Sequence, residues 1–470
     1  MNRILSLAAG LLVACSFAQA QSALPAAPGP RLLPVLQTSA GAGEPMHGSA
    51  GSSGSGQTAA NGSPQLSLSD AEQMAILNNP RVTVGKLMAL AQHQAYRQAL
   101  AAELPTATAA VTGVEAEEAT RISAGSLTAS RLFEHAGAGV SFTQLIYDFG
   151  HTHNLVLSSK LAEKASDANA LATIEEIVLA TDQAFYDALN AQALLRVAEQ
   201  TVSTRQTTDQ QVKEMTRNKL KSTLDLSFAD VNLSQAQLLK LDAQDNADAS
   251  MAVLDSVLGL DHNVQYDLVE DSAAPPPPPA SAEPLIHLAL LQRPDLQALN
   301  YDTQSAHKYT RAEWDQLLPS ISAAGTAGVV PVRPDQYYVT NWWGAVGGNV
   351  NIPVFNGFLY NAEAREAKYR EQAAAENSRD LRDQIVRDVT TSWLQANTAW
   401  QRLAVTEQLV QEADLAMKLA QTRYQMGLSS IVALSQAQLQ QTDAQIQNAS
   451  ARYQYRLALS TLNYEIGQAP

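Results

Sequence analysis

Residue types that could do chemistry are few and poorly grouped in this chain. His151 and His153 open a predicted helix, and residues two apart on a helix face different sides, so these side chains are not expected to share a metal ion. The sequence also contains no glycine-rich phosphate loop, no nucleophile elbow and no paired catalytic carboxylates in a fitting context. We therefore expect no enzyme, no cofactor and no metal site.

The single cysteine, Cys15, belongs to a predicted export signal. An apolar run follows the basic N-terminus, which is the pattern of a secretory signal peptide. Two cleavage sites remain open. Ordinary cleavage after Ala20 removes residues 1–20, whereas a lipobox ending at Cys15 removes residues 1–14 and leaves that cysteine lipidated. A single cysteine also excludes a disulfide framework.

Composition and charge argue against some classes of function. The 470 residues include 31 Lys and Arg against 46 Asp and Glu, a formal charge of −15, which argues against a nucleic-acid-binding surface. Aromatic residues make up only 6% while Ala and Gln are abundant, a composition that suits long packed helices. After the export signal, no apolar run approaches the ~20 residues that a membrane-spanning helix needs.

The chain consists of one unit that occurs twice. From residue 147 onward the two copies match at an offset of 208 residues, and upstream of residue 106 they match at an offset of 214. The difference must fall in a loop between these two regions, and the repeat has to be recognised before any other feature is interpreted. The pairs that fix the offsets are Pro80 with Pro294, Pro105 with Pro319, Tyr147 with Phe355, Ser222 with Ser430, Leu254 with Leu462 and Gly259 with Gly467.

Each copy contains two predicted strands, in which apolar residues alternate with polar or small ones. Strands of about ten alternating residues are typical of transmembrane β-barrels, although a soluble hairpin would show the same pattern. Four strands cannot close a barrel, and open edges are not tolerated in lipid, so a spanning barrel would have to be shared between chains. The predicted strands cover residues 106–117, 136–143, 320–330 and 343–352, with Tyr337, Tyr338, Trp342 and Trp343 placed as an interfacial aromatic girdle.

A long helix follows each strand pair. About 68 residues separate Gly150 from the break at Lys219, and a similar number separate Gly357 from Gly427, so each helix is about 100 Å long at 1.5 Å per residue. Shorter returning helices cover 222–258 and 430–466. A leading helix begins at a capping box, Ser69 to Glu72, and reaches residue 103. Whether this helix breaks at Pro80 stays open. Apolar residues at 3-and-4 spacing predict a coiled-coil seam: Ile177, Val178, Phe185, Ala188 and Leu195, matched by Ile385, Val386, Trp393, Ala396 and Leu403.

These elements define the expected domain organisation. Five consecutive prolines mark a stiff connector between the halves, and a stretch rich in Gly, Ser, Ala and Pro precedes the first half. The segments are a signal peptide at 1–20, or 1–14 for a lipoprotein, a disordered leader at 21–64, a first repeat at 65–272, a linker at 273–284 and a second repeat at 285–470.

Strand pair, long helix, sharp apex and returning helix, all occurring twice, resemble the TolC family of outer membrane efflux proteins. The motifs that carry the resemblance are Asn79-Pro80, Leu145 to Gly150, Pro353 to Gly357, Lys219 to Ser222 and Gly427 to Ser430. The resemblance implies a mostly α protein with a small β part, in which two tandem repeats of strand pair and helical hairpin form a trimeric α-barrel capped by a shared 12-stranded transmembrane β-barrel.

The same resemblance implies a passive exit duct without a catalytic site. Such a duct would lie in the outer membrane of a Gram-negative cell and extend into the periplasm, as the outer membrane channel of a tripartite efflux or type I secretion system. Its implied partners are two further copies of the chain, outer membrane lipid, a periplasmic adaptor (membrane fusion protein), and an inner-membrane pump or ABC exporter.

The family also implies where the functional residues lie. Family members hold the periplasmic tip shut by contacts between the two hairpins, and Tyr424 and Asp225 occupy the matching positions as a gate pair. Arg217 and Arg423 lie nearby and would pair with carboxylates of a neighbouring chain, although all four could equally be solvated residues at helix turns, where exposed ion pairs contribute little. The residues expected to dock an adaptor are Leu220, Ser222, Gly427, Leu428 and Ser430.

Three positions depart from the family pattern. Ala433 and Gln436 stand where members carry an acidic constriction ring, which puts cation block at those positions in doubt. Lys219 stands where glycine is usual, which weakens the inference of adaptor docking at the first apex. The rival interpretation is a periplasmic coiled-coil adaptor or structural protein, but an adaptor needs one hairpin and a lipoyl-like domain, whereas this chain has two hairpins and two strand pairs.

Overall fold

The computed structural model describes residues 64–115, 121–122, 130–131, 135–261, 264, 266–270, 274–332 and 342–468. The predicted export signal with Cys15, nearly all of the predicted leader, and the predicted girdle residues Tyr337 and Tyr338 lie outside this set. The chain divides into two units, residues 1–61 and 62–470, and every described residue belongs to the second unit. Among the described helices, none combines the length and the apolar character that crossing a membrane requires.

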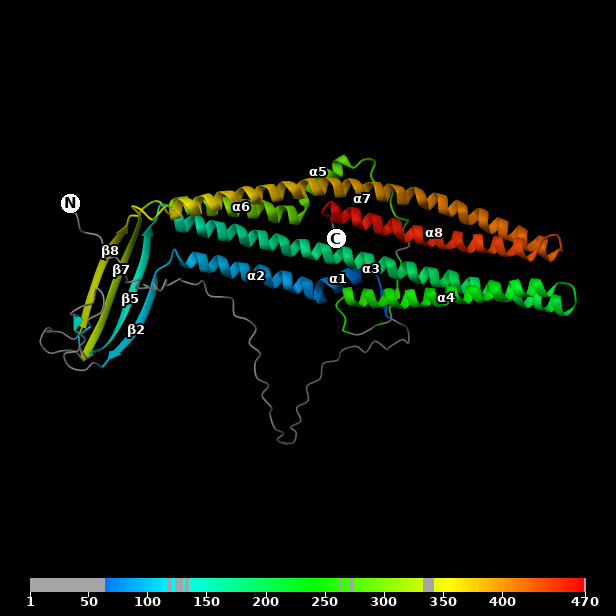
Figure 1. The fold of residues 1–470 in the computed structure, drawn as a ribbon, viewed down its shortest axis with the longest axis horizontal. Coiled ribbons are helices and arrows are strands. Elements are labelled where there is room, and N and C mark those ends of the chain that lie inside the picture. The colour runs from blue at the N-terminus through cyan, green and yellow to red at the C-terminus, as the bar shows by residue number, and fades with distance from the viewer. Residues whose placement is uncertain are drawn as a thin grey trace, which may run out of the picture. The chain divides into compact units, whose positions relative to one another are not determined.

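The second unit is mostly helical, with one four-stranded sheet (Figure 1). The helices are α1 Leu68–Asn78, α2 Pro80–Ala101, α3 His151–Arg217, α4 Thr223–Val257, α5 Glu283–Gln292, α6 Pro294–Asp315, α7 Leu359–Gln425 and α8 Ile431–Glu465. The sheet strands are β2 Thr106–Val114, β5 His135–Tyr147, β7 Ser320–Val332 and β8 Trp342–Asn351, and the short strands are β1 Gln65–Leu66, β3 Arg121–Ile122, β4 Ser130–Arg131 and β6 Asp267–Leu268.

The four-stranded sheet joins the two halves of the chain. Its order is β2-β5-β7-β8, and every neighbouring pair is antiparallel. Each half contributes a hairpin, and β5 and β7 pair across the halves, with Ala138 opposite Val329. The prediction of two strands per half is thus confirmed, while the parallel pair β1–β6 and the small pair β3–β4 were not predicted.

The long helices α3 and α7 have 67 residues each, which corresponds to about 100 Å at 1.5 Å per residue. In Figure 1, α2 and α4 lie end to end along α3, and α6 and α8 lie end to end along α7, as the packing of these pairs requires. Two shorter helices therefore match one long helix in each half, as the predicted lengths imply.

Each end-to-end joint depends on a glycine at the end of the returning helix. Gly259 has a φ of +73°, and a Cβ there would lie 2.8 Å from the carbonyl oxygen of Asn78, so the two helix ends meet closely only because this residue has no side chain. Asn79 closes the joint, because its Nδ2 donates to the carbonyl of Val257 at 2.8 Å while its Oδ1 caps α2. In the second half Gly467 has a φ of +72° at the matching place.

Arg293 occupies the position of Asn79 in the second joint. Its guanidinium donates to the carboxylates of Glu465, at the end of α8, and of Asp295, the latter at 2.7 Å. A charged clamp thus replaces the amide clamp of the first half, and in both halves the leading helix breaks before a proline. The break at Pro80 that the sequence left open is present.

The predicted capping box at the start of α1 was wrong. Ser67, two residues before the predicted Ser69, caps the helix. The Ser67 hydroxyl accepts from the Asp70 amide at 3.3 Å and donates to the Asp70 carboxylate at 2.6 Å. Glu72 is not available as a cap because it turns inward, against Asp182 of α3.

The seam prediction is largely confirmed. Ile177, Val178, Phe185 and Ala188 are buried in α3, as are Ile385 and Ala396 in α7. The remaining predicted residues differ, because Val386 is exposed and three are only half-buried, namely Leu195, Trp393 and Leu403. The proline-rich connector lies against the second half, where Trp393 Nε1 donates to the carbonyl of Pro279 at 2.8 Å and the Tyr455 hydroxyl donates to that of Pro276.

Candidate functional site

The two helical turns remote from the sheet form the candidate site. Both long helices end in the same capping motif, in which a residue with positive φ reverses the chain and two backbone amides satisfy the last carbonyls. At the second turn Gly427 has a φ of +75°, and the Leu428 amide donates to the Arg423 carbonyl at 2.8 Å. At the first turn Lys219 adopts a φ of +59°, and the Leu220 amide donates to the Met215 carbonyl at 2.8 Å.

A small apolar cluster holds the two turns together. It combines side chains from all four helices of the tip, so neither hairpin is complete without the other. Burial of this kind stabilises by about 25 cal/mol per Å² of apolar surface. The cluster consists of Val212 from α3, Ala229 from α4, Met417 and Tyr424 from α7, and Ile431, Leu434 and Ala437 from α8.

Tyr424 lies in this cluster with only 4% of its surface exposed. Its hydroxyl has no hydrogen-bond partner among the described residues, and the Lys221 Nζ lies 4.3 Å from the ring centroid, a cation–π distance. Burial raises the pKa of Tyr424, and the Asp225 carboxylate raises it further. The Asp225 carboxylate is therefore close enough to act on the Tyr424 hydroxyl electrostatically, but no hydrogen bond joins the predicted pair among the described residues.

Asp225 forms hydrogen bonds with Ser222 at the start of α4. Its Oδ2 accepts from the Ser222 amide at 3.1 Å and from the Ser222 hydroxyl at 3.2 Å, while that hydroxyl accepts from the Asp225 amide at 3.2 Å. These reciprocal bonds form a capping box, which satisfies free amides at the helix start. Ser430 has the same place at the start of α8, where its hydroxyl accepts from the Ala433 amide at 3.3 Å.

The remaining predicted residues lie on the surface of the tip. Arg217 is exposed and lies 3.6 Å from Glu214 of its own helix, and Arg423 is exposed as well. Leu220 and Leu428, predicted to dock a partner, are both exposed apolar side chains at the two turns. The histidines diverge as predicted, because His151 contacts the carbonyl of Ala312 and His153 contacts the carboxylate of Glu103.

Comparison with known proteins finds one matching family model and several relatives. The family described as "Outer membrane efflux protein" matches residues 285–468. The outer membrane protein TolC of Salmonella enteritidis is 22% identical over 347 residues, which cover 70% of this chain and 68% of that protein. TolC of Vibrio cholerae is 24% identical over 336 residues, which cover 70% of this chain and 76% of the relative.

The second half of the chain, residues 285–468, belongs to the outer membrane efflux protein family.

Solved structures of outer membrane proteins have the same fold. The outer membrane protein VceC of Vibrio cholerae has a TM-score of 0.73 at 17% identity, and the match covers 85% of this chain and 96% of that one. The CmeC outer membrane channel of Campylobacter jejuni has a TM-score of 0.75 at 18% identity, covering 86% of each chain. The family match of the second half and the TolC relatives indicate a location in the outer membrane, with an extension into the periplasm.

Several polar contacts between the two hairpins were not predicted. The buried Arg205 of α3 donates to the Gln438 side chain of α8, and Gln438 Nε2 donates to Thr208 at 3.2 Å. Burial lowers the pKa of Arg205 to about 10. Asn232 and Ser435 make a further bond between the hairpins at 2.7 Å. The repeat offered a signal, because the residue matching Arg205 in the second copy is an alanine, so an arginine there departs from the shared packing.

Proposed function

We propose that three copies of this chain form the outer membrane channel of a tripartite efflux or type I secretion system. The channel is a passive duct without catalytic activity, and it works with a periplasmic adaptor and an inner-membrane pump or ABC exporter. One observation carries this proposal: a four-stranded sheet, whose outer strands β2 and β8 each pair on one side only among the described residues, is attached to helices about 100 Å long.

The sheet supports an assembly of several chains. Its outer strands are β2 and β8, and every residue of β8 is exposed in the single chain, Val346 at 91%. Val111 of β2 is exposed at 86%. Strand edges in lipid have to be paired, and three copies joined edge to edge give the twelve-stranded closed barrel that a lipid environment allows.

The helices support the same assembly. Large apolar side chains are exposed along the single chain over its helices, and soluble monomers seldom expose contiguous apolar surface of this extent. Neighbouring copies in a tunnel would cover such side chains. Examples are Leu87 and Leu90 of α2, Leu238 and Leu241 of α4, and Leu415 and Leu419 of α7.

We assign the gate of this duct to the tip cluster. Tyr424 closes the contact between the hairpins, the Lys221 ammonium lies over its ring, and Asp225 caps α4 beside it. The exposed Arg217 and Arg423 would meet carboxylates of a neighbouring copy. The adaptor would bind the exposed turn residues, namely Leu220, Ser222, Gly427, Leu428 and Ser430.

The rival role of a periplasmic adaptor or structural protein is less well supported. An adaptor would present one hairpin and would have no use for a sheet whose outer strand is exposed along its full length. Two hairpins that share one apolar tip cluster fit a subunit of a closed ring better.

Cross-linking between sheet edges tests the assembly. Full-length protein carrying Ala110→Cys on β2 and Gly347→Cys on β8, extracted from membranes and oxidised, should give covalent trimers on a denaturing gel. Each single variant is the matched control, and it also controls for Cys15. A monomeric mass for the detergent-extracted protein, with no cross-linked species, would contradict the proposal.

A further inference from the structure

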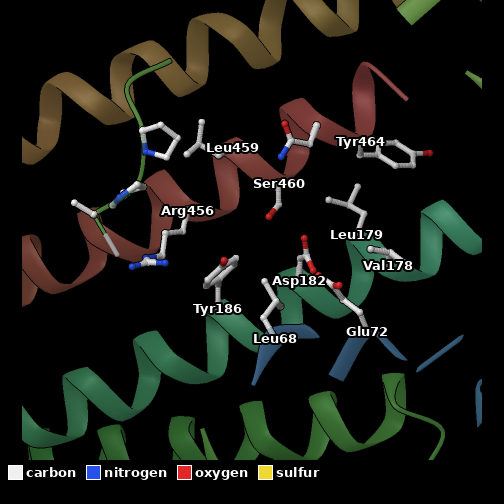
Figure 2. Close-up of a pocket in the computed structure, with 14 residues that line it drawn as sticks. Leu68, Glu72, Val178, Leu179, Asp182, Tyr186, Arg456, Leu459, Ser460 and Tyr464 are labelled. Atoms are coloured by element: carbon white, nitrogen blue, oxygen red, sulfur yellow. The ribbon is translucent and has the colours of Figure 1, made fainter. Parts of the chain in front are cut away.

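A cavity of about 290 Å³ lies where the first and second halves of the chain meet (Figure 2). Its walls come from α1, α3, α8 and the connector at residues 274–276. Figure 2 shows the carboxyl groups of Glu72 and Asp182 next to each other in the middle of the pocket, with the Ser460 side chain of α8 beside Asp182, which it hydrogen-bonds. A carboxyl pair in such a place has no role in the channel described above.

Burial dominates the electrostatics of the pair, and the charge of Asp182 adds to it at Glu72. Asp182 is only 5% exposed, and its Oδ1 has no hydrogen-bond partner among the described residues. Burial and the Asp182 charge raise the pKa of Glu72 to about 7, and burial raises that of Asp182. Arg456 of α8 also lines the pocket, but it interacts with Tyr186 and lies 3.9 Å from Glu270.

The fold does not need these carboxyls. By the offsets of the repeat, Glu72 corresponds to Ile286 and Asp182 to Thr390 in the second half. Ile286 there packs against an apolar cluster. The second half thus builds the same helix contact without acids. Asp182 hydrogen-bonds Ser460 and Glu72, but its Oδ1 has no partner among the described residues, and burying an acidic pair in this way costs free energy. A destabilising pair that only one copy carries indicates a binding role.

We propose that this pocket binds the ammonium group of a small organic amine. An alkylammonium offers N–H donors to Asp182 Oδ1 and to Glu72, and it restores neutrality to the pair. The walls fit its carbon chain, because Leu68, Val178, Leu459 and Pro275 line the cavity, and the ring of Tyr186 offers a further surface for a cation.

A divalent metal ion fits this pocket less well. Calcium takes six to eight oxygen ligands and magnesium demands an octahedral set. The described residues contain no cluster of three or more acidic, histidine or cysteine side chains that could hold a metal ion. A proton shared by the two carboxyls is the other occupant, and it competes with the amine because both neutralise the same charge.

Calorimetric titration of the full-length, detergent-extracted protein with n-butylammonium chloride tests the site. We expect saturable binding at pH 8, where the pair is largely ionised, and at least about tenfold weaker binding at pH 5.5, where protons occupy the pair. Asp182→Asn should weaken the affinity by about tenfold or more, because a hydrogen bond to a charged group is lost. Glu176→Gln is the matched control, an exposed acid on the same helix, and should bind like the unchanged protein.

The outcomes separate the amine from its rivals. Absence of saturable binding at pH 8 leaves the proton as the only occupant and overturns the proposal, as does equal binding by the Asp182→Asn protein. Equal affinity for tetramethylammonium, which has no N–H donor, or for calcium would overturn the recognition by N–H groups. If Asp182→Asn does not assemble, the pH dependence in the unchanged protein decides, since binding that is equal at both pH values contradicts the site. The pocket lies within one chain, so the result does not depend on conduction.

Discussion

Tyr424 fills the tip cluster with its ring, while its hydroxyl has no partner among the described residues. Tyr424→Phe should therefore change the stability of the tip by less than about 1 kcal/mol, because no buried hydrogen bond is lost. Tyr424→Ala should destabilise the tip by about 3–5 kcal/mol, since it leaves a cavity between the hairpins. Hydrogen exchange of the tip amides in the two variants measures the difference.

The control for this comparison is Tyr369→Ala on the same helix, because the Tyr369 side chain is exposed. That variant should exchange like the unchanged protein. Equal loss of protection in Tyr424→Phe and Tyr424→Ala would show that the hydroxyl, and not the ring, makes the contact.

The buried Glu72 should give the protein a characteristic pH dependence. Its pKa is about 7 in the folded chain against an ordinary 4.5, so the folded state binds the proton more tightly than the unfolded state does. Stability should therefore fall as the pH rises from about 4.5 to about 7 and stay constant above that range.

Glu72→Gln removes this titration. The variant should melt at the same temperature as the unchanged protein near pH 4.5 and at a higher temperature at pH 8, which thermal unfolding across the pH range measures. Glu176→Gln, an exposed acid, should follow the unchanged protein. A Glu72→Gln protein that is less stable at pH 8 would mean that the ionised carboxylate is stabilised in the fold.

At the residue level, the sequence predicted only part of what the structure shows. The proximity of Tyr424 and Asp225 was expected because the family pattern relates positions on both hairpins. The contact of Lys221 with the Tyr424 ring and the pair of Glu72 and Asp182 were not expected. These contacts join residues far apart in the chain, and periodicity within one helix carries no information about them.

At the element level, the first helical turn carries an unusual residue. Lys219 holds a φ of +59° where the second turn has Gly427, and a side chain in this conformation costs free energy that glycine avoids. Lys219→Gly should therefore stabilise the first turn by about 0.5–1 kcal/mol, less the entropy that glycine gains in the unfolded chain. Hydrogen exchange of the turn amides measures the change.

Two variants check the cause. Lys219→Ala keeps a Cβ and should gain nothing, while Gly427→Ala should lose about 1 kcal/mol through backbone strain alone, because no atom lies within 4 Å of a Cβ placed there. Stabilisation by Lys219→Ala equal to that by Lys219→Gly would point to the lysine charge instead of the backbone.

The boundaries of the main elements could be predicted because the residues that mark each boundary occur at matching positions in both copies of the repeat. The long helices were expected between Gly150 and Lys219 and between Gly357 and Gly427, and α3 and α7 fill these intervals. The pair β1–β6 escaped prediction because strands of two residues have no periodicity. The capping box was predicted at the wrong residues because Glu72 lies against Asp182 in the interior and does not cap α1.

At the scale of the whole molecule, the account depends on how copies of the chain associate. The sequence could indicate that four strands are too few for a barrel, but it could not place β2 and β8 at the edges of one sheet, since strand order depends on pairing between the halves. With that order known, the trimeric duct becomes a specific proposal about two exposed strands and one tip cluster.

Single-channel conductance in a planar bilayer tests the central claim most directly. The full-length protein, extracted from membranes and trimeric, should give a small conductance that prefers cations, in keeping with its formal charge of −15. Tyr424→Ala should raise this conductance severalfold, because it removes the ring that joins the hairpins at the tip. A conductance that stays the same in Tyr424→Ala would be compatible with the proposed duct but would contradict the assignment of its gate to the tip cluster. No conductance from a trimeric sample would contradict the channel itself.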